Sequence, residues 1–305
     1  MLVYLARRFL VSVLILVGVS VVTFCLTFMI PADPVALIAG RTSTPEVREQ
    51  IRHQLGLDRP LHEQYLRYLR ALAKGDLGRS YARKSDVGEL IASRLPATLL
   101  LMLGAIIAEL LIGLPAGIYA ASRRGRPADK TAMILSFVTV STPQFVLGLT
   151  LLYVFAYLLG WFPLSGYGSL SHLILPAVTL GLAGGGWYSR MMRSSMIEVL
   201  RHDYIRTARA KGMGEGRVLL HHALRNAILP VIAMIGLDVG IFMSGVVVEN
   251  VFGWPGIGQL MWQAIQSLDI PIIMGITVTA AIFIVAGNFL ADLITPAIDP
   301  RIRLR

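Results

Sequence analysis

Four acidic residues lie within or at the edge of long apolar runs, where an ionisable side chain is costly. They are Glu109, Asp238, Glu249 and Asp292. Such carboxylates either pair inside a helix bundle or line a polar pathway, and each is a functional candidate by default. None has a Lys or Arg in its own run. We single out Asp238, because the flanking Gly236 and Gly240 let neighbouring helices approach closely.

A second polar group interrupts the apolar run 132–159 and consists of Thr139, Ser141, Thr142, Pro143 and Gln144. Proline removes a backbone hydrogen bond, and nearby hydroxyls can satisfy the freed carbonyl, so we expect a kinked helix with a polar lining. A kink that lines a pore and one that only packs look alike in sequence, and both interpretations stay open. Thr142, Gln144, Asp238 and Ser244 make up our candidate translocation path.

The sequence lacks motifs for catalysis or nucleotide binding. It has neither the GxxxxGK[ST] phosphate loop nor the HExxH zinc helix. No histidine lies inside an apolar run, which removes the usual base for a hydrolase in the membrane. We therefore expect no catalytic residue, no metal site and no cofactor in this chain, and we expect its energy to come from other proteins.

The segment 190–226 is too long for a simple turn between two apolar runs. Asp203 is a suitable N-cap, residues 204–211 favour a short helix, and Gly212 with Gly214 can end it. Such a helix between two membrane spans is well placed to receive force from a soluble partner. The alternative is a basic loop attracted to anionic lipid. The residues of this helix and of the turn after it are Asp203, Tyr204, Ile205, Arg206, Thr207, Ala208, Arg209, Ala210, Lys211, Gly212, Met213 and Gly214.

Membrane helices must position these residues. Of the 305 residues, 55% are apolar and only 15% are charged, which is typical of a membrane protein. A helix needs about 20 apolar residues to cross a bilayer. We expect an all-α, polytopic protein with six spans. They are residues 9–30, 97–121, 132–159, 173–188, 229–248 and 272–296.

The net charge of +10 reflects topology rather than a nucleic-acid partner. The Lys and Arg of the long segment 31–96 say little about topology, because long translocated segments largely escape the positive-inside rule. The other basic residues lie on one side of the predicted spans. These are Arg7, Arg8, Arg123, Arg124, Arg126, Lys130, those of 190–225, Arg301, Arg303 and Arg305. The short loops 160–172 and 249–271 contain no Lys or Arg. By the positive-inside rule, both termini are predicted to be cytoplasmic.

The segment 31–96 is predicted to be a small helical element outside the membrane. Thr44 can cap a helix that starts at Pro45, and a second helix is expected from about Pro60 to just before Gly75. It is either a solvated cap or a docking surface. The predicted organisation is thus an N-terminal span (1–30), this segment (31–96), a five-helix core (97–296) containing the loop 190–226, and a cytoplasmic tail (297–305).

Several of these stretches together resemble the permease subunits of dipeptide- and oligopeptide-type ABC importers. The central one is DYIRTARAKG at 203–212, followed by HALRN at 222–226 and by Leu229 and Pro230. Others are YLARR at 4–8, PADP at 31–34, LGLD at 55–58, GDLG at 75–78 and VFGWPGIG at 251–258. The resemblance extends over almost the whole chain.

The resemblance implies a type I ABC importer permease fold in a bacterial inner membrane. It further implies that residues 203–214 form a coupling helix that docks on a cytoplasmic ATPase. The implied partners are a second homologous permease, two ATPase subunits that hold ATP and Mg, and an extracytoplasmic binding protein that delivers peptides. Glutathione and nickel importers resemble this subfamily closely, so the substrate stays open.

Three other functions are alternatives to a permease subunit. An ion-coupled carrier would need ionisable groups clustered near the bilayer midplane and inverted repeats, and neither is evident. A membrane-embedded enzyme would need a nucleophile and a base at matching depth, and the sequence shows no such pair. A structural scaffold fits the pattern of apolar runs, but the capped cytoplasmic helix argues against it.

Overall fold

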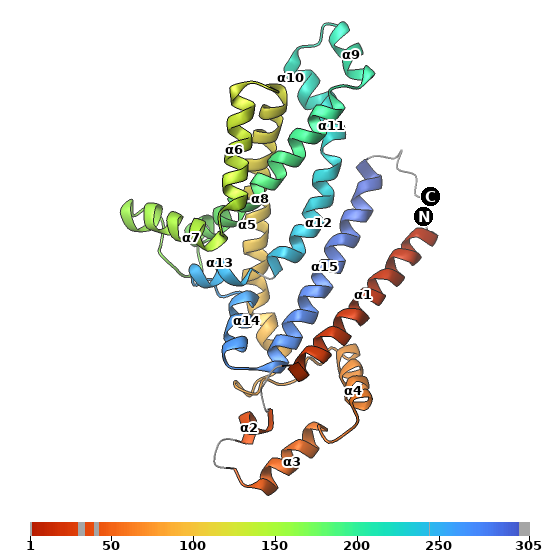
Figure 1. Ribbon diagram of the computed structural model, residues 1–305, viewed down its shortest axis with the longest axis vertical. Helices are drawn as coiled ribbons and strands as arrows, with labels where there is room; N and C mark the ends of the chain where they lie inside the picture. Colours follow the sequence, from red (N-terminus) through yellow and green to blue (C-terminus); the bar gives the residue numbers. More distant parts are fainter. Residues whose placement is uncertain (1, 30–33, 40–42, 244, 299–305) are drawn as a thin grey trace.

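The computed structural model describes residues 2–29, 34–39, 43–243 and 245–298. Within these ranges the regular structure is helical, and the β-pairing is limited to one isolated bridge between Arg79 and Asp86. A tilted bundle occupies the middle of the molecule, with short helices at both ends (Figure 1). The helix α9 lies at one end and α3 at the other, and we call these the α9 end and the α3 end.

The helices follow one another in a simple order. They are α1 (Leu2–Met29), α2 (Pro34–Ala39), α3 (Pro45–Leu55), α4 (Leu61–Ala73), α5 (Val87–Ser122), α6 (Pro127–Ser141), α7 (Gln144–Leu151), the π-helix η1 (Leu152–Leu158), α8 (Leu170–Val199), α9 (Asp203–Ala210), α10 (Glu215–Arg217), the π-helix η2 (Val218–Ala223), α11 (Leu224–Ala227), α12 (Leu229–Met243), α13 (Val246–Val251), α14 (Ile257–Gln266) and α15 (Ile270–Ile298).

Four of the described helices are long and apolar enough to cross a membrane, namely α1, α5, α8 and α15. Two further spans arise if each of two bent helix pairs counts as one, which gives the six that the sequence predicts. The pairs are α6 with α7 and η1, bent by 102°, and the segment 215–227 with α12, bent by 52°.

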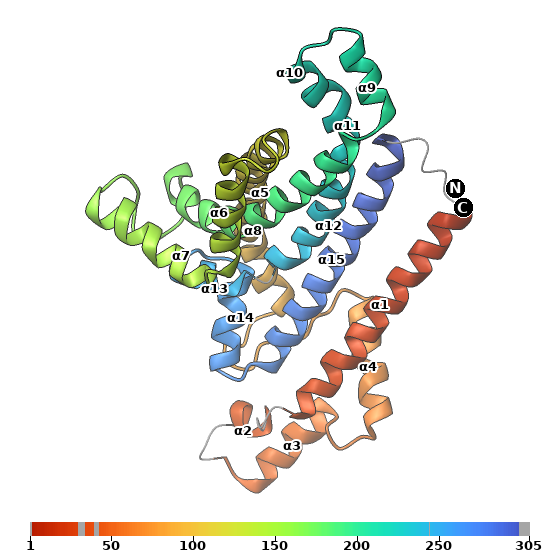
Figure 2. The same ribbon diagram turned by 45° about the horizontal axis from the view of Figure 1, so that its top comes forward.

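The sequence predicts one kinked helix over 132–159, but the bend is much larger than a kink. The chain turns by 102° between α6 and α7. Thr142 ends α6 in an extended conformation (φ −81°, ψ 125°), and Pro143 precedes α7. Proline disfavours the helical conformation of the residue before it, which explains the position of the break. The helix α7 therefore points away from the bundle (Figure 2).

Three other predicted boundaries are corrected. The helix α5 begins at Val87 rather than at 97, because Asp86 caps it by accepting a hydrogen bond from the Glu89 N–H at 3.1 Å. The helix α8 runs to Val199 instead of ending at 188. The helix α12 ends at Met243, before the predicted limit of 248.

The helices α5 and α8 have the most extensive contact in the bundle, and glycines allow their close approach. A Cβ built on Gly117 would lie 2.5 Å from the Ser189 carbonyl oxygen, and one on Gly113 would lie 2.8 Å from that of Gly185. Both positions on α5 therefore have α8 backbone where a side chain would be. Small residues four apart are a common basis for close helix packing in membranes.

The segment between α1 and α5 forms the helices that the sequence predicts. The Thr44 side chain accepts from the Val47 N–H at 3.5 Å at the start of α3, and α4 begins directly after Pro60. Tyr65 on α4 hydrogen bonds Ser20 on α1 at 2.9 Å, so this segment packs alongside α1. No residue of α3 or α4 is fully buried.

Candidate functional site

The helix α9 projects beyond the bundle at the α9 end, and its inward face is anchored to the core. Ile205 is fully buried and Ala208 nearly so. Both pack in an apolar cluster with Met196 and Val199 of α8 and with Val218. This contact fixes α9 to the end of the long helix α8, so a force on α9 can pass directly into the bundle.

Polar contacts hold the rest of α9 in place. The Asn226 amide donates to the Tyr204 hydroxyl at 2.6 Å, which joins α9 to α11. Arg209 donates to both carboxylate oxygens of Glu215, at 2.7 and 3.2 Å, which joins α9 to α10. Gly212 has a φ of +78°, a conformation that favours glycine and that turns the chain after α9.

The outward face of α9 carries the side chains that remain open to a partner. Asp203, Arg206, Thr207 and Ala210 are exposed and lie opposite Ile205 and Ala208 on the helix. Lys211 and Gly214 are also exposed, whereas Met213 is half-buried against the apolar cluster. Two details of the prediction are wrong: His202 is the N-cap, with Asp203 in the first turn, and Gly214 precedes α10 rather than ending α9.

The three described residues of the candidate path do not form one group. Thr142 and Gln144 flank Pro143 at the break between α6 and α7, and the Thr142 hydroxyl donates to the Val138 carbonyl at 2.7 Å. Asp238 is buried in α12 and accepts from the Tyr188 hydroxyl of α8. Ser244 lies outside the described residues.

Three of the acidic residues that lack a basic partner in their own apolar runs have polar neighbours on other helices. Glu109 on α5 faces Asp238, so these two and Tyr188 form one cluster. Glu249 is fully buried and accepts from the Thr98 hydroxyl and from the Gln259 N–H, both at 2.8 Å. The side chain of Asp292 lies outside the described part.

Sequence reasoning missed how tightly the stretch 251–258 is bound to α5. The Trp254 indole N–H donates to the Ala97 carbonyl at 2.8 Å, and the Ile257 N–H donates to the Thr98 hydroxyl at 2.8 Å. Two features of the sequence point to this region: Glu249 is an acidic residue at the edge of an apolar run, and Trp254 belongs to the VFGWPGIG stretch. Glu249, Trp254 and Ile257 all bind the part of α5 at Ala97 and Thr98, which lies more than 150 residues away in the sequence.

A second missed residue, Asp269, clamps the loop before α5 at the α3 end. Its carboxylate accepts from the Ser80 hydroxyl at 2.5 Å and from the backbone N–H groups of Tyr81 and Ala82 at 3.2 and 3.0 Å. Burial, and secondly the Asp269 carboxylate, raise the pKa of Tyr81. The phenol therefore stays neutral at physiological pH.

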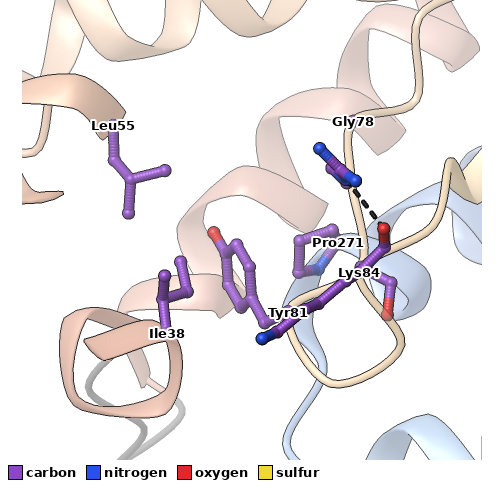
Figure 3. Close-up of a pocket in the computed structure, with 8 residues that line it drawn as sticks. Ile38, Leu55, Gly78, Tyr81, Lys84 and Pro271 are labelled. Carbon is purple, nitrogen blue, oxygen red and sulfur yellow. Dashed lines mark hydrogen bonds between the residues drawn. The ribbon is translucent and has the colours of Figure 1, made fainter. Parts of the chain in front are cut away.

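The Asp269 clamp forms one wall of a pocket of about 520 Å³ between this loop and the short helices α2 and α3. Figure 3 shows the Tyr81 ring between Ile38 and Pro271, with Leu55 facing it from α3. Lys84 lies at the same pocket, where its carbonyl accepts from the Arg79 guanidinium at 2.9 Å. The α3 end thus presents an apolar hollow edged by basic side chains.

Two family models match the chain, one on each side of the middle of α5. The binding-protein-dependent transport system inner membrane component matches residues 113–304, and the N-terminal model of the same kind of membrane component matches residues 1–102. The chain belongs to this family. It is a multi-pass inner-membrane protein and a permease subunit of the ABC importer type.

Curated relatives match the permease from end to end. It is 42% identical over 311 residues to the oligopeptide transport system permease protein AppB of Bacillus subtilis, which covers 98% of both chains. It is 40% identical over 306 residues to the glutathione transport system permease protein GsiC of Escherichia coli O6:H1, which covers 100% of both.

A solved structure supports the fold of the permease. The MetNI methionine ABC transporter, described as inward facing, matches with a TM-score of 0.59 and 18% identity over 68% of this chain and 96% of that chain. At this identity the likeness concerns the fold alone. It agrees with the type I importer permease fold that the sequence predicts.

Proposed function

We propose that this permease translocates peptides that an extracytoplasmic binding protein delivers, and that partner ATPases drive it through α9. The observation that carries the proposal is the end-to-end match to a binding-protein-dependent family, together with a short helix whose inner face is anchored and whose outer face is open. Glutathione and nickel or another small solute are the alternatives within the same kind of machine. A relative named for oligopeptides at 42% identity supports the choice of peptides.

The proposed assembly has four kinds of component. A second permease of similar fold completes the path, two cytoplasmic ATPases hold ATP and Mg, and the binding protein approaches the α3 end. This chain supplies no cofactor and no catalytic group. Its α9 end faces the cytoplasm in this arrangement, in agreement with the Lys and Arg of the connecting segments.

Closure of the ATPases on ATP would press on α9, and the apolar cluster around Ile205 and Ala208 would pass the displacement to α8. The α5–α8 pair would then move as a unit against the second permease, which exposes the path to one side of the membrane at a time. Such coupling requires contacts that differ between the two states. Thr142, Gln144 and Asp238 stay our candidates near the path, together with Ser244.

Co-purification of the tagged permease with its own ATPases tests the role of α9. Ala210→Glu places a charge on the outward face of α9, so we expect at least a roughly tenfold loss of retained ATPase, equivalent to about 1.4 kcal/mol. Ala73→Glu is the matched control, because Ala73 is also exposed and also ends its helix, but at the α3 end.

Three outcomes are informative. Loss in Ala210→Glu alone supports docking through α9. Equal retention in both variants contradicts the assignment of α9. Absence of any ATPase with the unaltered permease contradicts the proposed assembly, provided that the ATPases are expressed.

A further inference from the structure

Three polar side chains from three different helices meet inside the bundle. Glu109 lies on α5, Tyr188 on α8 and Asp238 on α12, and these helices run close together in Figure 1. Glu109 and Tyr188 are each 1% exposed and Asp238 is 9% exposed. We call Glu109 and Asp238 the acid pair.

The acid pair has one hydrogen-bond donor too few. The Tyr188 hydroxyl has a single proton, and it donates this proton to Asp238 Oδ2. Glu109 lies within hydrogen-bonding reach of the Asp238 carboxyl, yet its buried Oε2 has no donor from which to accept while both groups are ionised. Two ionised carboxylates only accept, so they cannot satisfy one another. A buried polar atom left without a partner is costly, and it calls for an explanation.

No described cation compensates the acid pair. The ion pairs among described residues do not include Glu109 or Asp238; the one near this part of α8 joins Arg193 to Asp129 of α6. The described side chains of α15, which packs on α12, include no titratable group. Tyr188 is therefore the remaining titratable group facing the pair. Two adjacent buried carboxylates without a counter-ion cannot both stay ionised.

On the side of α8 there is no room for a hydrated ion beside Glu109. A Cβ built on Gly184 of α8 would lie only 1.5 Å from Glu109 Oε1, so the carboxyl rests directly on the α8 backbone. A proton needs no such space. It would also supply the donor that Oε2 lacks.

We propose that the acid pair is a proton-binding site, in which one proton sits on Glu109 Oε2 and is donated to the Asp238 carboxylate. The hydrogen bonds then run from Glu109 to Asp238 and from Tyr188 to Asp238, which ties α5, α8 and α12 together. Asp238 acts as the shared acceptor at this junction. The proposal concerns a junction within this chain and does not rest on the proposed substrate or partners.

Infrared spectroscopy of the full-length permease in lipid bilayers tests the site directly. The spectrum of the unaltered protein minus that of Glu109→Gln should contain the C=O stretch of a protonated carboxylic acid, moved to lower frequency in D₂O. Glu198→Gln is the matched control, because Glu198 is an exposed glutamate on α8. Its difference spectrum should lack this protonated-acid band. A Glu109→Gln difference with carboxylate bands alone overturns the proposal.

Isotope labelling shows, without any substitution, whether a glutamate or an aspartate carries the proton. Carboxyl-¹³C glutamate should shift the protonated-acid band, whereas carboxyl-¹³C aspartate should leave it in place. A shift with aspartate alone would place the proton on the other carboxyl and overturn the assignment to Glu109. Absence of the band from the unaltered protein overturns the site altogether.

Stability adds an independent readout. Glutamine keeps the volume and the donor of a protonated Glu109, so Glu109→Gln should unfold at nearly the same temperature as the unaltered permease. Glu109→Ala removes the donor and leaves a cavity, and it should unfold at a lower temperature. A Glu109→Gln variant less stable than Glu109→Ala would show that the ionised carboxylate is needed, which contradicts the proposal.

Discussion

At the scale of single residues, buried polar side chains hold the loop after α12 against the bundle. Thr98 on α5 is the central one: its hydroxyl donates to Glu249 Oε1 at 2.8 Å and accepts from the Ile257 N–H at 2.8 Å. The Glu249 carboxylate also receives the Gln259 N–H. One hydroxyl thus connects α5, α13 and the start of α14.

Thr98→Val should lower the stability of the permease while preserving the shape of the side chain. The substitution leaves a Glu249 oxygen and the Ile257 N–H without these partners, and each buried group left unpaired costs about 1–3 kcal/mol. The midpoint of unfolding in an SDS titration measures the change. Thr131→Val is the control, because Thr131 is exposed and its hydroxyl donates only to the Pro127 carbonyl within its own helix. Equal midpoints for the two variants would contradict the role of Thr98.

At the scale of helices, the contact of α5 with α8 depends on glycines that face backbone. Gly117 meets the Ser189 carbonyl, and Gly181 on α8 would place a Cβ 2.4 Å from that of Ala108. Because the atoms on the far side belong to backbone or to Cβ positions, they cannot rotate away. The two helices would have to separate to admit a methyl group.

Gly117→Ala is expected to destabilise the permease by about 1–3 kcal/mol, as overpacking does in a close-packed interior. Thermal unfolding in detergent, followed by tryptophan fluorescence, gives the comparison. Gly18→Ala on α1 is the matched control, because no heavy atom lies within 4 Å of the Cβ that it would add. If Gly117→Ala unfolds with the control, the close approach of α5 and α8 does not limit stability.

At the scale of the whole molecule, the two ends differ in character. The α9 end carries a short helix anchored on α8, whereas the α3 end carries the loop clamped by Asp269 and the pocket of Figure 3. The bundle lies between them (Figure 1). If the bundle spans a bilayer, the two ends are exposed to opposite compartments.

Cysteine labelling from either side of the membrane tests this arrangement. The sequence contains a single cysteine, Cys25, so a Cys25→Ser background accepts new cysteines cleanly. A membrane-impermeant maleimide should label Thr207→Cys on α9 only in inverted vesicles, and His62→Cys on α4 only from outside intact spheroplasts. Both positions are exposed. Labelling of both from the same side would contradict the proposed topology.

The sequence alone was sufficient for the class of protein, the family resemblance, the number of candidate spans and the position of α9. These features depend on local or additive properties of the sequence. The length of each apolar run gives the candidate spans, and capping residues and glycines mark the ends of short helices such as α9. Helix ends were less predictable. Pro143 coincides with a 102° bend, whereas Pro96, Pro115 and Pro176 lie inside continuous helices. The same residue type has different effects, because neighbouring helices decide whether the lost hydrogen bond is tolerated.

The tertiary structure decided which polar residues meet. Glu109 and Asp238 look equally solitary in the sequence, and so do Glu249 and Asp269. Each becomes part of a cluster only when helices far apart in the chain are packed together. Contact between side chains from different helices depends on their crossing, their rotation and the glycines between them, and no local pattern encodes all three. The chemistry of each residue type was therefore readable from the sequence, but its partner was not.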